Sequence, residues 1–310
     1  MVYEICMKVR IIFTTLFLML MLVVSAYASE DTKQLNTNSN SYQERLAPIQ
    51  HPPMVKAGHG ISSVKGPKNI INDYSYNWAG YAISGGVGSI TSVEGSWEVP
   101  TATQSIPGQR TYSAHWLGID GFSSSSVEQI GTSSDTDAYG IPSYYVWYEF
   151  YPSPAYMFTN FPIKPGDVIY AKVTYTPAVS KNPKKPANGG TYILTLTVNG
   201  ETVTKTSTTV KADRSSAEWV SEAPSRGGVL PLANFGTCDY GFDNTHVANT
   251  CTYTMNGVPS TIGGTANTDA VHKIDMTSES SSSDNIITKA STSTISTSGT
   301  SFDVTCVSAI

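Results

Sequence analysis

The stretch TYILTLTVNGETVTKT, residues 191–206, indicates the fold class of this 310-residue chain. Large apolar side chains at positions 192, 194, 196 and 198 recur at every second residue, which is the period-two pattern of a half-buried strand. Asn199–Gly200 follows, and this dipeptide favours the two-residue turn of a β-hairpin. The segment from Glu201 onward continues as a second extended stretch. We therefore predict an antiparallel hairpin at this point of the chain.

Similar extended patterns recur elsewhere, in TSVEGSWEVP (91–100), SYYVWYEFYP (143–152) and GDVIYAKVTYTP (166–177). Only 14% of the residues are charged, while Gly, Ser, Thr, Tyr and Asn are abundant, a composition that favours strands and polar loops over helices. The Ser/Thr-rich end could be a low-complexity stalk, but NIITKA and FDVTCVSAI carry apolar residues that favour strands. We predict an all-β fold with little helix, an antiparallel β-sandwich of two sheets.

The N-terminus has the features of an export signal. Lys8 and Arg10 precede an apolar run over residues 11–24, and Ala26-Tyr27-Ala28 supplies small residues at a cleavage point. A membrane anchor is the alternative, because the run approaches the roughly 20 residues that span a bilayer. The small residues favour cleavage, so we predict that residues 1–28 are removed and that the protein is secreted. No other segment is apolar enough to span a membrane.

Residues 29–71 differ in composition from the rest and are predicted to be a pro-segment or a linker. Their net charge is +2, against −8 for residues 72–310, which we expect to form one domain. A basic segment of this kind can dock on an acidic domain and leave it as carboxylates become protonated. A flexible linker is the other interpretation.

Three of the four cysteines lie outside the expected signal. Cys238 and Cys251 enclose a short polar loop, and in an oxidising compartment this spacing predicts a disulfide, with Cys306 left over. The chain has neither C-x-x-C nor H-E-x-x-H, so we expect no metal and no cofactor.

The search for catalytic groups leaves mainly carboxylates. A serine hydrolase of the G-x-S-x-G type is excluded because that motif is absent, and we interpret His115, although close to Asp120 in the sequence, as structural. Glu149, in the aromatic stretch VWYEFYP, suggests a glycosidase or a lectin, but no second carboxylate stands two positions away on the same strand.

Eight short blocks follow one another in a characteristic order from residue 77 to residue 236. They are NWAGYAISGG (77–86), EGSWEVP (94–100), HWLGIDG (115–121), VEQIG (127–131), VWYEFYP (146–152), PGDVI (165–169), AEWVSE (217–222) and LANFG (232–236). In order and spacing they resemble the glutamic peptidases, the eqolisin family of acid endopeptidases. The resemblance extends from about residue 76 to the C-terminus.

The resemblance implies a two-sheet sandwich similar to the concanavalin A-like jelly roll of lectins, with a concave face for an extended peptide. It implies that Gln129 and Glu222 are the catalytic pair, and that other residues line or support the cleft: Trp78, Trp116, Asp120 and Glu149. Glu218 corresponds to no catalytic position. The expected partners are polypeptide substrates rather than nucleic acid or membrane, and we expect a monomer.

These residue types suit peptide hydrolysis. A carboxylate such as Glu222 can take a proton from water and return it to the leaving amine. The Gln129 amide can hold the water through its oxygen and donate N–H to the developing oxyanion. Glu128, one residue earlier, is expected to face the opposite side of the strand. A catalytically silent peptide- or glycan-binding module on the same fold is the alternative, and a glycosidase dependent on Glu149 is the third.

Overall fold

The computed structural model describes residues 42–57, 64–65, 70–179, 189–209, 212–241, 251–264, 270–278 and 286–308. All of them belong to one compact unit, Tyr42–Ile310. The described ranges contain strands, turns and loops but no helix, and so they hold no helix that could cross a membrane. The predicted signal, residues 1–28, lies outside the described residues.

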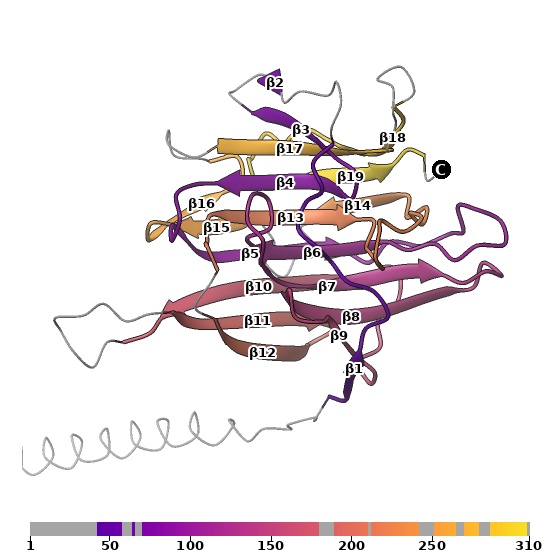
Figure 1. Ribbon diagram of the computed structural model, residues 1–310, viewed down its shortest axis with the longest axis horizontal. Helices are drawn as coiled ribbons and strands as arrows, with labels where there is room; N and C mark the ends of the chain where they lie inside the picture. Colours follow the sequence, from indigo (N-terminus) through magenta and orange to yellow (C-terminus); the bar gives the residue numbers. More distant parts are fainter. Residues whose placement is uncertain are drawn as a thin grey trace, which may run out of the picture. The chain divides into compact units, whose positions relative to one another are not determined.

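One sheet, which we call the front sheet, contains strands in the spatial order β3-β17-β4-β13-β6-β7-β8-β9-β1 (Figure 1). Their bounds are β3 Ile71–Ser75, β17 Ala270–Thr277, β4 Trp78–Ser84, β13 Ser216–Glu222, β6 Ala114–Ile119, β7 Val127–Thr136, β8 Pro142–Tyr151, β9 Tyr156–Phe158 and β1 Glu44–Leu46. Every pairing is antiparallel except that of β3 with β17. The short strand β2, Val64–Lys65, pairs with β3.

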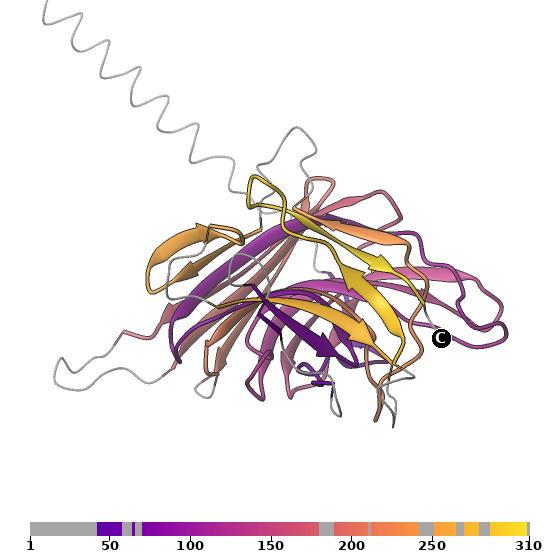
Figure 2. The same ribbon diagram turned by 90° about the horizontal axis from the view of Figure 1, so that it is seen from above.

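The other sheet, the back sheet, is built around β5, Ile90–Glu98. On one side of β5 the strands β10, β11 and β12 follow in that order. On the other side, both β15 and β14 pair with β5. Strand β15 also pairs with β16, β14 pairs with β19, and β19 pairs with β18. Their bounds are β10 Val168–Pro177, β11 Gly190–Val198, β12 Glu201–Thr209, β14 Thr237–Tyr240, β15 Thr252–Met255, β16 Val258–Thr261, β18 Thr288–Thr292 and β19 Phe302–Cys306. Figure 2 shows the strands stacked in two layers.

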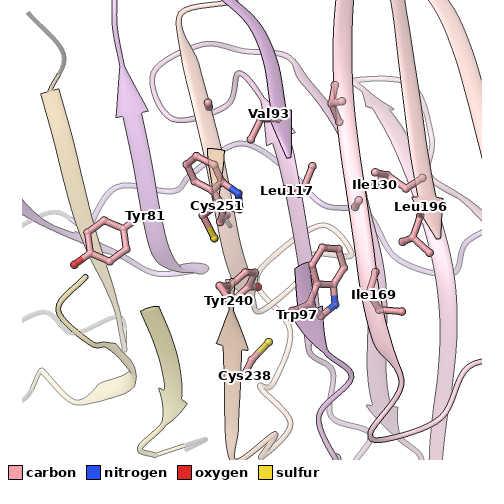
Figure 3. Close-up of a cluster of buried hydrophobic side chains, with 14 of the residues drawn as sticks. Tyr81, Val93, Trp97, Leu117, Ile130, Ile169, Leu196, Cys238, Tyr240 and Cys251 are labelled. Carbon is pink, nitrogen blue, oxygen red and sulfur yellow. The ribbon is translucent and has the colours of Figure 1, made fainter. Parts of the chain in front are cut away.

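The core lies between the sheets. Leu117 and Ile130 of the front sheet and Ile169 and Leu196 of the back sheet belong to one cluster of fully buried side chains (Figure 3). Burying a side chain of this size contributes about 1.5–3 kcal/mol. Because strand side chains alternate between faces, the remaining residues of the front sheet point away from this core. That second face, the outer face of the front sheet, carries a separate aromatic cluster around Trp116.

The predicted two-sheet antiparallel sandwich is confirmed. The hairpin at Asn199–Gly200 is present as β11 and β12, with both turn residues at positive φ. The Ser/Thr-rich end supplies β18 and β19 and is part of the sandwich. Local alternation was sufficient for these predictions because each of these strands packs one face on the same core.

The predicted Cys238–Cys251 disulfide is wrong: both residues are free, buried thiols. Cys238 Sγ lies 3.9 Å from the carbonyl oxygen of Glu98, whereas Cys251 Sγ lies beside Gly95. These two positions are about 10 Å apart along β5, given a rise of about 3.3 Å per residue, and a disulfide needs its sulfurs about 2 Å apart. The thiols therefore pack separately in the core (Figure 3).

Residues 42–57, which belong to the predicted pro-segment or linker, pack on the front sheet. The backbone of Gln50 exchanges two hydrogen bonds with Ser225, each 2.9 Å long. Further along, the Met54 nitrogen donates to the Gly121 oxygen at 3.0 Å. The segment thus crosses the outer face of the front sheet close to the residues that the sequence predicts for the site.

Candidate active site

Strand β13 places Glu222 on the outer face of the front sheet. Ala217 and Trp219 point into the core between the sheets, and Val220 belongs to the outer aromatic cluster, so Glu218 and Glu222 share its face by alternation. Both glutamates are fully buried. The pairing of β13 with β4 puts Glu222 opposite Trp78.

Gln129 and Glu149 are directly opposite each other on β7 and β8. The Gln129 Nε2 donates to Glu149 Oε2 at 3.0 Å, and both side chains are fully buried. The Oε1 of Gln129 has no hydrogen-bond partner among the described residues. Glu128 is also buried, and its charge would act on Tyr192 in the core of the sandwich, so it faces away from Gln129 as expected.

Three tryptophans surround these polar groups. The Trp116 Nε1 donates to Glu222 Oε2 at 3.0 Å, and Trp78 packs edge-on against Trp116 with ring centroids 4.9 Å apart. Trp147 of β8 belongs to the same cluster. These apolar walls exclude water and strengthen the electrostatic interactions of the carboxyl groups.

His51 joins the predicted catalytic residues, and sequence reasoning missed this role. Its ring lies flat on Trp147, with centroids 3.4 Å apart and planes 6° from parallel. Its Nδ1 is 2.9 Å from Glu222 Oε2, while its carbonyl oxygen accepts from Gln129 Nε2 at 2.6 Å. Its backbone nitrogen donates to Glu149 Oε2 at 3.0 Å. The only signal in the sequence was a histidine in a basic segment ahead of an acidic domain.

Burial controls the ionisation of this cluster. Desolvation lowers the pKa of His51 well below its usual value. It raises the pKa of Glu222 well above the usual range, with the nearby Glu149 charge adding to the rise and the hydrogen bond from Trp116 opposing it. Desolvation also raises the pKa of Glu149 to about 8, against the hydrogen bonds that it accepts. While the segment is seated, burial therefore favours the uncharged forms of both Glu222 and His51.

Asp120 has a different role from the other predicted site residues. Its carboxylate accepts from the backbone nitrogens of Arg214 and Ser215, at 2.6 and 2.8 Å, and from the Ser215 hydroxyl. It stands at φ 73°, in the left-handed region, just after β6. Asp120 thus anchors the chain where it enters β13, the strand that ends at Glu222.

Two other histidines form polar contacts. His115 is buried, its Nδ1 is 3.0 Å from the Ser221 hydroxyl, and desolvation lowers its pKa to about 3, which agrees with a structural residue. His272 lies between Ser84 Oγ, at 2.9 Å, and Asp73 Oδ2, at 2.6 Å. This Ser-His-Asp arrangement, spread over β4, β17 and β3, was not visible in the sequence because its members are up to 199 residues apart.

The chain matches the model of the Peptidase A4 family over residues 76–299. It belongs to that family. The chain is 32% identical over 190 residues to aspergillopepsin-2 of Aspergillus niger, an alignment that covers 54% of this chain and 63% of that protein. The chain therefore spans less than two thirds of the length of this curated relative.

Solved structures with a similar fold include two of scytalido-glutamic peptidase, one with a transition-state analogue inhibitor and one with a peptide-based transition-state analogue. They share 21% and 22% identity with this chain, at TM-scores of 0.49 and 0.47. A third is SCP-B, an eqolisin in complex with the tripeptide Ala-Ile-His, with 22% identity and a TM-score of 0.44. Each match covers 75% of this chain and 98% of the other.

Proposed function

We propose that this protein is an acid endopeptidase of the glutamic type, exported as a precursor, in which Gln129 and Glu222 activate the attacking water. Family membership supports the reaction class. The single observation that carries the assignment of residues is that Gln129 and Glu222 both bind His51, one at its carbonyl oxygen and the other at its side chain. Two residues from strands β7 and β13 thus reach the same residue of an extended segment, one at its backbone and the other at its side chain.

The reaction follows from the chemistry of the two side chains. Glu222 takes a proton from a water molecule, whose oxygen adds to the carbonyl carbon of the substrate. The N–H of Gln129 stabilises the negative charge that develops on the carbonyl oxygen. The C–N bond then breaks, and Glu222 delivers its proton to the leaving nitrogen. Trp116 orients the Glu222 carboxyl throughout by donating to Oε2.

The enzyme cannot carry out this reaction while residues 42–57 lie on the front sheet. The base must be ionised to accept a proton, but burial beneath His51 raises the pKa of Glu222 well above the usual range. His51 also occupies the N–H of Gln129. In our proposal, residues 29–71 therefore act as a pro-segment that keeps the enzyme inactive until it leaves.

Substitution of the pair tests the function. In protein expressed without residues 1–28 and acidified to about pH 3 to 4, we expect Glu222→Gln to reduce digestion of a denatured protein by about 10²–10⁴-fold. We expect Gln129→Ala to reduce it by about 10²–10³-fold, the usual loss when one oxyanion donor is removed.

Two matched control variants show whether a loss of digestion is specific to the proposed catalytic pair. Glu218→Gln changes a buried glutamate on the same face of the same strand and should leave digestion unchanged. Ser84→Ala removes the hydroxyl of the Ser84–His272–Asp73 arrangement and should also leave it unchanged. Full activity in Glu222→Gln would contradict the proposal, and binding of peptides without cleavage by the wild type would favour a silent binding module.

A further inference from the structure

The segment over residues 48–55 lies on the front sheet in the manner of a bound peptide. Its backbone, rather than its side chains, makes most of its hydrogen bonds with the domain. The Pro48 oxygen accepts from Arg226 Nε at 2.9 Å, and Gln50 pairs through both its nitrogen and its oxygen with Ser225. Backbone contacts of this kind do not depend on sequence, so other extended peptides can use them.

The same pattern continues beyond His51. The Pro53 oxygen accepts from Asn77 Nδ2 at 3.3 Å, and the Val55 nitrogen donates to Asn77 Oδ1 at 2.7 Å. Residues 52 and 53 are prolines and have no backbone N–H to satisfy. The segment therefore contacts the domain through its backbone on both sides of the His51–Pro52 bond.

His51 is the residue of the segment that both members of the candidate catalytic pair contact. Its carbonyl oxygen accepts from Gln129, the group assigned to the oxyanion, and the backbone nitrogen of His51 is held by Glu149. Glu222 lies against the side chain of the same residue.

Building on the proposed function, we propose that residues 48–55 occupy the path of a peptide substrate, with the His51–Pro52 bond at the cleavage position and Pro52 protecting that bond. Two features protect it. The imidazole binds Glu222, so the base is free to act on water only when acid breaks that contact, and Pro52 is then the remaining protection. The nitrogen of the bond belongs to the proline ring, which fixes the backbone and removes the N–H that an ordinary leaving amide carries.

Replacing the protecting proline tests this inference. Hydrolysis at this position would break the bond between the His51 carbonyl carbon and the nitrogen of residue 52, adding the OH of water to that carbon and the other proton of water to that nitrogen. We expect full-length Pro52→Ala precursor, after acidification, to be cut between residues 51 and 52 at least about tenfold faster than wild type, a barrier change of roughly 1.4 kcal/mol. Intact mass and N-terminal sequencing identify the cut. The rate should be the same after tenfold dilution, because the cut is made within one molecule.

The controls separate the inference from the proposed function. Pro53→Ala alters the neighbouring proline but leaves the 51–52 bond as an X-Pro bond, so no cut should appear there. The double variant Pro52→Ala, Glu222→Gln should also remain intact. If wild type digests denatured protein but Pro52→Ala is not cut after residue 51, the inference is overturned and the function stands. If the wild type digests nothing, both fail.

Discussion

The His51 Nδ1 and the Glu222 Oε2 lie 2.9 Å apart in a site closed to solvent, a contact that needs one proton between the two atoms. Desolvation lowers the pKa of the imidazole and raises that of the carboxyl, so the seated pair has no net charge whichever atom carries the proton. When the segment leaves, His51 returns toward its usual pKa of 6.5 and Glu222 toward a lower one. Binding of the segment is therefore linked to proton binding.

The sign of this linkage depends on the pH range. At pH values below the pKa of Glu222 in the open site, His51 and Glu222 bind two protons when the segment is released and one when it is seated. Acidification therefore favours release of the segment. Above pH 6.5 the released pair binds none, so docking also weakens there. Glu149, whose pKa burial raises to about 8, takes up a proton on docking and favours the seated state as the pH falls toward its open-state value. At pH values below the open-state pKa of Glu149, only the His51–Glu222 pair changes its number of bound protons when the segment docks.

The protonation of His51 and Glu222 predicts that acid releases the segment around His51. We expect protection of the backbone amides of residues 47–57 from hydrogen exchange, corrected for intrinsic rates, to fall by up to tenfold per pH unit below about pH 4. In His51→Gln the titrating ring is absent, so protection should change little over the same range. Equal protection of the wild type at pH 4 and pH 3, where only the His51–Glu222 pair responds, would contradict this account.

At the scale of the strands, the site depends on close packing of β6 against β7. Gly131 of β7 stands between Trp116 and Trp147 in the register of the sheet. A Cβ at this glycine would lie 2.4 Å from Trp116 Cβ and 2.5 Å from the His115 oxygen. The glycine therefore lets the two indoles occupy neighbouring positions on the outer face.

Gly131→Ala should therefore destabilise the protein and impair the site together. Overpacking of this kind costs about 1–3 kcal/mol, and displacing Trp116 also displaces its hydrogen bond to Glu222. Urea unfolding measures the first effect and digestion of denatured protein the second. Gly86→Ala is the matched control, because a Cβ there meets no atom within 4 Å. Equal unfolding midpoints for the two variants would contradict this prediction, because β6 and β7 could then move apart at no cost in stability.

Within the described ranges of the molecule, several carboxyl groups are buried without an ion pair to Lys or Arg. Desolvation raises the pKa of Asp135 to about 7 and, with the Asp120 charge adding to it, that of Glu128 to about 9. A group with a raised pKa contributes its full stabilisation below its unfolded value and loses it as the pH rises through its folded value. Such a fold is most stable when these groups are protonated, which agrees with the proposed activity in acid.

We accordingly expect thermal stability to increase when the pH is lowered from 8 to 5. Each buried group contributes up to about 1.4 kcal/mol per pH unit between its unfolded and folded pKa. In Asp135→Asn the dependence between pH 4 and 7 should be weaker than in wild type, because one of these groups no longer titrates. A melting temperature that falls on acidification from pH 8 to 5 would contradict the prediction.

Period-two alternation and turn residues were enough to predict the sandwich, because a strand's side chains choose their faces locally. The same alternation predicted that Glu128 and Gln129 face opposite sides. The order of the blocks singled out Gln129 and Glu222, although nothing local placed β7 near β13. Those inferences needed only residue types and their spacing.

Contacts between distant parts of the chain were decided by the tertiary structure alone. The 12 residues between Cys238 and Cys251 suggested a disulfide, but packing along β5 separates the two thiols. His51 reaches Glu222 across 171 residues, through backbone pairing of the segment that no sequence periodicity records. Alternation determines which face a side chain takes, whereas docking depends on the shape and hydrogen-bonding groups of a surface that exists only after the strands have assembled.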